Sequence, residues 1–157
     1  MNRETMLKAM TTSTSEVLET MFFMSVDVVA PTAEQEFGAG VASEHVNAKL
    51  SFKGPVSGCM LLQVPALLAQ EITADFLGVA TSQVDVEQVA GTVMEMVNML
   101  TGNTLSVYDS DAVFDLGVPR IVKGEQKIDE IIHAGEPIHI NLDTLDSRII
   151  LTLACQA

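Results

Sequence analysis

Apolar residues recur at every third or fourth position in two long stretches of the chain, which is the pattern of an amphipathic helix. The first stretch covers residues 4–24, and its less helical run 11–15 indicates a helix start near Ser13, with Glu16 closing a capping box. The second stretch covers residues 82–105, with Ser82 as the expected N-cap. The pattern therefore predicts two long helices, one in each half of the chain.

A strand hairpin and a shorter helix are expected between these two helices. Residues 45–52 alternate, with four apolar side chains on one face of a pleat: Val46, Ala48, Leu50 and Phe52. A turn at residues 53–55 leads into the apolar run 56–64, which should pair back as a hairpin. Pro65 suits the first turn of a helix, so residues 66–77 are predicted to be helical.

The last third of the chain, from about residue 113, has the pattern of short strands. The clearest stretches are 131–132, 138–142 and 148–155, with turns expected at 135–137 and 143–146. Short turns, rather than helices, join these strands. Such connections favour antiparallel pairing.

The two halves of the chain resemble each other. Residues 15–25 can be laid over residues 91–101 with an offset of 76, so that Glu19 aligns with Glu95. A duplicated helix-plus-strands unit explains this match, and chance similarity between two amphipathic helices is the alternative. The duplication predicts an α+β fold (two layers, α/β) in which a pseudo-twofold axis relates the two long helices and brings Glu19 and Glu95 to equivalent positions.

Composition narrows the possible partners. The chain has 157 residues, 48% of them hydrophobic, and its formal net charge is −13, with eight Lys and Arg residues scattered along it. This charge disfavours nucleic acid and anionic membranes as partners and favours a basic one. No apolar run approaches the ~18 residues of a membrane span, and the N-terminus lacks the apolar core of a signal peptide, so we expect a cytoplasmic protein. Cys59 and Cys155 read as buried thiols.

One face of the second long helix combines a carboxylate with an amide. Its core stripe contains Val89, Val93, Met96, Val97 and Leu100. The opposite face carries Gln88, Gly91, Glu95, Asn98 and Gly102. Glu95 and Asn98 are neighbours at helical spacing, and the two flanking glycines suggest that another surface approaches closely. A solvated face with an ordinary polar pair is the simpler alternative.

Residues 93–103 resemble the active helix of the CheC/CheX/FliY family, phosphatases that dephosphorylate the response regulator CheY. The family pattern is Asp or Ser, three residues, Glu, two residues, Asn, and a Pro about twenty residues later. Glu95, Asn98 and Pro119 match it, whereas Gly91 stands where Asp or Ser is usual. The departure at Gly91 puts that position's contact in question.

Within this resemblance the chain is most like CheX. The first helix keeps Ser15 and Glu19 but has Phe22 in place of the Asn, so only the second copy carries the pair. The resemblance implies one CheX-like domain over residues 1–157, with paired long helices on an antiparallel sheet. It also implies a homodimer, for which the apolar stretch 149–154, if it is an exposed edge, is the expected contact.

The resemblance also implies how the site works. Asn98 would orient the attacking water, because phosphoryl transfer is mostly positioning and electrostatics. Glu95 would pair with a lysine beside the partner's phosphoryl group, and Gln88, Gly91 and Gly102 would contact the partner. The phospho-aspartate and its Mg²⁺ would belong to a CheY-like response regulator, so no cofactor or metal is expected on this chain.

Other chemistry has weaker support in the sequence. His133 and His139 flank a turn but have no nearby Cys, and the three acids Asp109, Asp111 and Asp115 lack the Gly and Glu of a calcium loop. Two other functions stay open. One is a non-catalytic adaptor that binds a receiver domain, which the departure at Gly91 favours. The other is a small acidic secretion chaperone, which would need neither the Glu–Asn pair nor a repeat.

Overall fold

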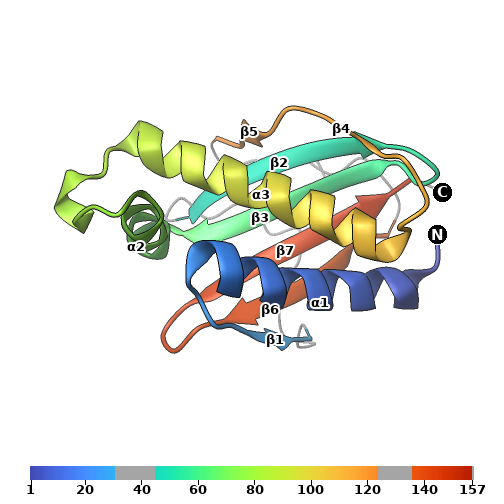
Figure 1. Cartoon of the computed structure of the whole chain (residues 1–157), viewed down its shortest axis with the longest axis horizontal. Coiled ribbons are helices and arrows are strands. Elements are labelled where there is room, and N and C mark those ends of the chain that lie inside the picture. Colours follow the sequence, from blue (N-terminus) through green and yellow to red (C-terminus); the bar gives the residue numbers. More distant parts are fainter. Residues whose placement is uncertain (31–44, 124–135, 157) are drawn as a thin grey trace.

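The computed structural model describes residues 1–30, 45–123 and 136–156. In these ranges, three α-helices cover one face of a seven-stranded antiparallel sheet (Figure 1). The helices are α1 (Arg3–Phe22), α2 (Ala66–Leu77) and α3 (Val86–Tyr108). The strands are β1 (Asp27–Val29), β2 (His45–Lys53), β3 (Gly58–Pro65), β4 (Asp115–Leu116), β5 (Arg120–Ile121), β6 (Ile138–Asp143) and β7 (Arg148–Cys155).

The order of the strands reveals two interlocked halves. It is β1-β6-β7-β3-β2-β4, and β5 also pairs with β2. The strand that follows α1 pairs with β6 of the second half, while the strands that follow α3 pair with β2 of the first half. A two-fold axis between the central strands β3 and β7 produces this exchange. The α+β duplication predicted from the sequence is therefore present in the topology.

The two long helices lie side by side and run in opposite directions (Figure 1). Their buried positions match at a shift of 83 residues, which pairs Met6 with Val89 and Phe22 with Leu105; every buried residue of α1 then meets a buried residue of α3. At the predicted shift of 76, only two buried α1 residues would do so, namely Ser13 and Val17. The predicted equivalence of Glu19 and Glu95 is therefore wrong.

The first predicted stretch is helical nearly from its first residue, but the predicted start near Ser13 and the predicted cap Ser82 are wrong. The Asn2 side chain caps α1 by accepting a hydrogen bond from the Thr5 N–H at 3.0 Å, so Ser13 is a buried interior residue and not a start. The cap of α3 is Asp85, since Ser82 lies in the short 3₁₀ turn Thr81–Gln83. The cap of α3 lies three residues after the predicted serine, whereas that of α1 lies eleven residues before it, and in both cases an Asn or Asp oxygen accepts the N–H.

The strands agree more closely with the sequence prediction. The β2–β3 hairpin and the helix at residues 66–77 are confirmed, as are β6 and β7. The expected strand at 131–132 and part of the turn at 135–137 lie outside the described residues. The expectation that residues 149–154 form an exposed edge is wrong, because β7 pairs with β6 on one side and β3 on the other. In the described part of the chain, no helix has the length and apolar character to cross a membrane.

Candidate functional site

The outer face of α3 carries the predicted pair. Glu95 is exposed and Asn98 is half-buried. The core stripe of the same helix is fully buried at four positions, Val93, Met96, Val97 and Leu100. The helix thus buries one stripe against α1 and the sheet and turns the opposite one outward. Removing either polar side chain would leave no cavity in the core.

The two glycines of this face differ in their surroundings. A Cβ on Gly91 would meet nothing within 4 Å, while one on Gly102 would meet Leu116 Cδ1 at 3.6 Å, an ordinary contact. Packing among the described residues therefore does not require glycine at Gly91. Gly91 leaves the face without a side chain on one side of Glu95 and Asn98, and half-buried Gly102 lies beside Leu116 on the other.

Gln88 has a structural role that the sequence analysis did not assign. Its Oε1 accepts the Asp85 N–H at 2.9 Å, and its own N–H donates to Asp85 Oδ1 at 2.8 Å. This reciprocal pair is a capping box, which satisfies two otherwise unpaired donors at the start of α3. The spacing Asp-x-x-Gln before a long apolar pattern could have revealed it.

The segment that follows α3 returns to lie beside this face. Leu116 contacts the helix at Gly102, one turn beyond Asn98. The segment is fixed to the sheet by the Gly117 N–H, which donates to the Ser51 carbonyl at 2.7 Å, and by Phe114, whose ring meets Phe52 edge-on at 6.3 Å. Pro119, the residue at the family's proline spacing, is half-buried two positions after Gly117. The sequence predicted the proline but not this packing.

The equivalent face of α1 lacks the pair. At the shift of 83 residues, Thr12 stands where α3 has Glu95, and Ser15 stands where α3 has Asn98. Phe22 is fully buried and stacks on Phe76 with ring centroids 5.1 Å apart. Only α3 therefore presents a carboxylate and an amide together.

Among the described residues, the other candidates do not gather into a site. His139 Nδ1 lies 2.8 Å from Thr152 Oγ1, and burial together with the charge of Arg3 lowers the pKa of His139 to about 4. Its predicted neighbour His133 lies outside the described residues. Asp109 Oδ1 accepts the Asp111 N–H at 3.2 Å, as in a turn. Among the residues that the structure describes, no three His, Cys, Asp or Glu side chains gather as metal ligands.

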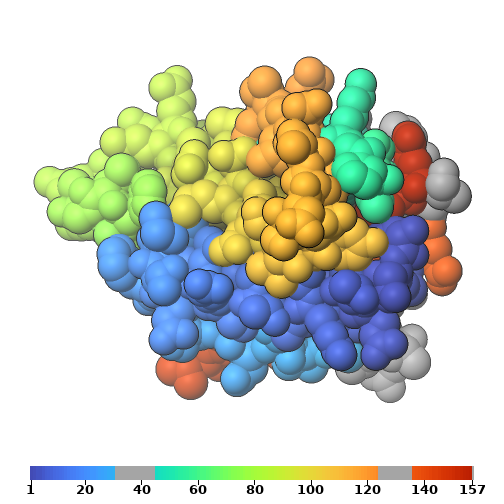
Figure 2. Space-filling model, turned by 45° about the vertical axis from the view of Figure 1, so that its right-hand side comes forward, coloured from blue at the N-terminus to red at the C-terminus, as the bar shows by residue number. Residues whose placement is uncertain are grey.

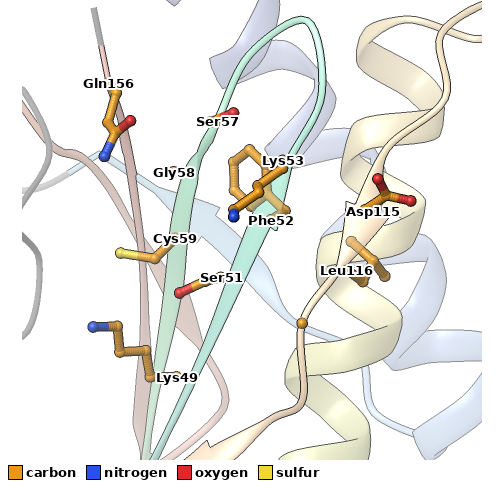
Figure 3. A pocket seen from close by; sticks show the side chains of 11 residues that line it. Lys49, Ser51, Phe52, Lys53, Ser57, Gly58, Cys59, Asp115, Leu116 and Gln156 are labelled. Carbon is orange, nitrogen blue, oxygen red and sulfur yellow. The ribbon is translucent and has the colours of Figure 1, made fainter.

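A shallow pocket of about 470 Å³ opens at the β2–β3 hairpin (Figure 3). Lys49, Lys53 and Cys59 point into it, away from α3, and the segment with Asp115 and Leu116 runs between the hairpin and the helix. Both thiols of the chain are buried, as predicted, and burial raises the pKa of Cys59 and that of Cys155, the latter to about 11. Neither Glu95 nor Asn98 lines this pocket, which shares Leu116 with the segment beside their helix face.

Comparison with known proteins identifies the family and the solved structures that the chain resembles. The sequence model of the family described as "Chemotaxis phosphatase CheX" matches residues 46–142. No curated protein matches the chain. A CheC-like superfamily protein from Shewanella sp. PV-4 has a similar structure, with a TM-score of 0.79 and 23% identity over 100% of both chains.

Two further solved structures are similar. CheX from Vibrio vulnificus has a TM-score of 0.74 at 21% identity, with 96% of each chain covered. A chain in the CheX–CheY–BeF₃–Mg²⁺ complex from Borrelia burgdorferi also has a TM-score of 0.74 at 21% identity, covering 98% of this chain and 97% of that one. At these identities the structures establish the shared fold. Because the family model spans more than half of the sequence, the chain belongs to the CheX chemotaxis phosphatase family.

Proposed function

We propose that this chain hydrolyses the aspartyl phosphate of a CheY-like response regulator, using Glu95 and Asn98 of α3. The observation that carries the proposal is the joint projection of these two side chains from a helix face that the described chain leaves open. Membership of the CheX family supports the reaction class. Such a site is completed only when the partner docks on it.

Asn98 is proposed to hold the attacking water. A side-chain amide has an acceptor oxygen and two N–H donors, so it can orient a water while remaining uncharged. Phosphoryl transfer requires this water in line with the bond that breaks, and little covalent chemistry from the protein. The half-buried position of Asn98 restricts its rotamers, which supports an orienting role.

Glu95 is proposed to dock to a lysine beside the partner's phosphoryl group. It is exposed and lies one helical turn from Asn98, so one partner surface can reach both. The Mg²⁺ is assigned to the partner. In the Borrelia burgdorferi complex, CheX and CheY occur together with Mg²⁺ and BeF₃, a group that stands in for the phosphoryl group.

Gly91, Gly102 and Gln88 are proposed to border the contact. Gly91 allows a partner to come close to the helix, Gly102 lies where Leu116 joins this surface, and Gln88 lies at the exposed start of the helix. The departure at Gly91 from the family's Asp or Ser removes one polar contact, and this observation favours a non-catalytic adaptor as the second candidate.

A phosphate-release assay separates the two candidates. CheY would be phosphorylated with acetyl phosphate and Mg²⁺, and its dephosphorylation would be followed with and without this chain. We expect the parent chain to accelerate phosphate loss and the double variant Glu95→Ala/Asn98→Ala not to do so. Hydrolysis at the parent rate by the double variant would refute the site. Binding without hydrolysis by the parent chain would establish the adaptor.

We also propose that residues 1–157 act as one cytoplasmic domain that forms a homodimer. Since β7 is central, the contact must use another surface, and the sheet ends at β1 on one side and at β4 and β5 on the other. Light scattering of the purified chain at micromolar concentration tests the assembly. A strictly monomeric chain would rule out the dimer without changing the catalytic assignment.

A further inference from the structure

An apolar ridge stands beside the Glu95–Asn98 face. We use this name for Val113, Leu116 and Val118 in the segment that follows α3, which stands out in orange next to the helix in Figure 2. Val113 is 81% exposed, Val118 77% and Leu116 38%. Leu116 Cδ1 lies 3.6 Å from the place that a Cβ on Gly102 would take, one turn from Asn98, so the ridge borders the helix face that carries the polar pair.

The backbone of the apolar ridge is anchored to the sheet. Asp115 and Leu116 pair with the end of β2, and the next residue, Gly117, donates its N–H to the Ser51 carbonyl at 2.7 Å. The ring of Phe114 points inward against Phe52. Because the backbone is already fixed, a partner that covers the valines has little chain entropy to remove.

The surroundings of the ridge indicate what kind of partner fits it. Clustered exposed apolar side chains with a polar border are typical of an interaction surface. The border here carries Asp111, exposed on the same segment, and Glu95 on the helix, whereas Asp115 pairs in register with Lys53 and lines the hairpin pocket. A complementary surface has apolar side chains surrounded by Lys or Arg.

We propose that the apolar ridge is a second docking contact for the receiver domain of the response regulator. The proposal rests on the proposed function, because a receiver that brings its phosphoryl group to Asn98 must lie over the surface that adjoins the ridge. In this arrangement Glu95 and Asn98 contact groups around the phospho-aspartate, while the ridge contacts the receiver's surface beside it. The ridge therefore contributes to the choice among receivers.

The test removes the apolar surface without touching the polar pair. The variant is Val113→Ser/Val118→Ser, and the matched control is Leu145→Ser, a fully exposed leucine in the β6–β7 turn. Calorimetry with CheY, BeF₃ and Mg²⁺ measures the Kd, and hydrolysis of CheY phosphorylated with acetyl phosphate gives KM and kcat. We expect Kd and KM to rise roughly tenfold or more in the double variant, with kcat and the Tm close to the parent values. Leu145→Ser should change none of them.

The outcomes separate this inference from the proposed function. Binding of the double variant with the parent Kd would overturn the docking contact while leaving the phosphatase proposal intact. A fall in kcat at unchanged KM would also overturn it, because a docking contact acts on association. A parent chain that binds CheY through the valines but hydrolyses nothing would keep the docking contact and refute the phosphatase.

Discussion

The two long helices of this protein bury the same pattern of positions on their inner faces and present different outer faces. At the shift of 83 residues, all buried positions of α1 coincide with buried positions of α3. On the outer face, α1 presents Lys8, Thr12, Ser15 and Glu19, whereas α3 presents Gly91, Glu95, Asn98 and Gly102. The helices therefore share the pattern of burial where they pack, and only α3 combines a carboxylate with an amide on its outer face.

This difference shows where each constraint acts. Packing constrains both inner faces because each helix must fill the same groove against the sheet and the other helix. The outer faces carry no such requirement, so one of them can hold reactive groups at no expense to the core. The predictions below test this separation of packing from chemistry.

The largest effect is expected from Phe22→Asn, which would complete the family pattern in the first helix at the shift of 76. Phe22 is fully buried against Phe76, so the variant loses a core aromatic side chain and buries an amide. We expect the free energy of unfolding to fall by about 3–5 kcal/mol, measured by urea denaturation. Glu19→Asn, on the exposed side, should change it little. A stable Phe22→Asn variant with additional phosphatase activity would show that the shift of 76, and not that of 83, relates the two helices.

Asn98→Ala should have the largest effect on chemistry. We expect kcat for phosphorylated CheY to fall by roughly 10² to 10³, as commonly follows the loss of one transition-state hydrogen bond. The Kd for CheY with BeF₃ and the Tm should stay near the parent values, because the side chain supports no core contact. Ser15→Ala, its counterpart on α1, should leave kcat unchanged. Equal losses in the two variants would contradict the assignment of chemistry to α3 alone.

Glu95→Ala should weaken association rather than catalysis. Deleting one charge of a cross-interface pair is expected to raise KM by about tenfold, and higher concentrations of phosphorylated CheY should partly restore the rate. Steady-state kinetics of this variant beside Glu19→Ala, an exposed acid on α1, would test this expectation. If raising the substrate concentration fails to restore the rate of Glu95→Ala, the carboxylate acts in the chemical step instead.

The smallest effect is expected in the pH dependence of stability, to which His139 of β6 contributes. In the second half, the half-buried His139 has its pKa lowered from 6.5 to about 4. The unfolded chain then binds more protons between these values, so this contribution to stability is present above pH 6.5 and is lost as the pH falls towards 4. We expect a loss of about 1 kcal/mol after allowance for solvent screening, or roughly 3 °C in Tm.

The variant His139→Gln isolates this contribution. Thermal unfolding at pH 7 and pH 4.5 should show a smaller pH-dependent change in Tm for this variant than for the parent chain. The same change in both proteins would mean that another group is responsible.

Much of the fold could be predicted because its signals are local. The alternation in β2, the helix at 66–77 and the polar stripe of α3 all follow from the spacing of side chains within one element. The helix caps were harder to predict, because Asp85 and Ser82 are both suitable caps near the start of α3, and because the polar run 11–15 continues α1 instead of starting it. Asn2 and Asp85 are preferred over the serines, and only their hydrogen bonds distinguish them.

The site could be predicted in the same way, but only in part. Glu95 and Asn98 lie on one helix, so their common face is fixed by the helical repeat. The apolar ridge could not be anticipated, since Val113 and Val118 reach the site through the pairing of their segment with β2, which lies more than sixty residues earlier.

The sequence by itself determined the amphipathic helices, the Glu–Asn face, the acidic charge and the CheX resemblance, because each depends on residue types at short spacing. Tertiary structure decided the register of the repeat and the central position of β7. Shifts of 76 and 83 residues differ by seven residues, which is about two helical turns, so both superimpose one amphipathic pattern on the other. An apolar strand likewise has the same pattern at an edge or in the centre of a sheet. Only contacts between distant segments distinguish these alternatives. They make Thr12, not Glu19, the residue of α1 that is equivalent to Glu95.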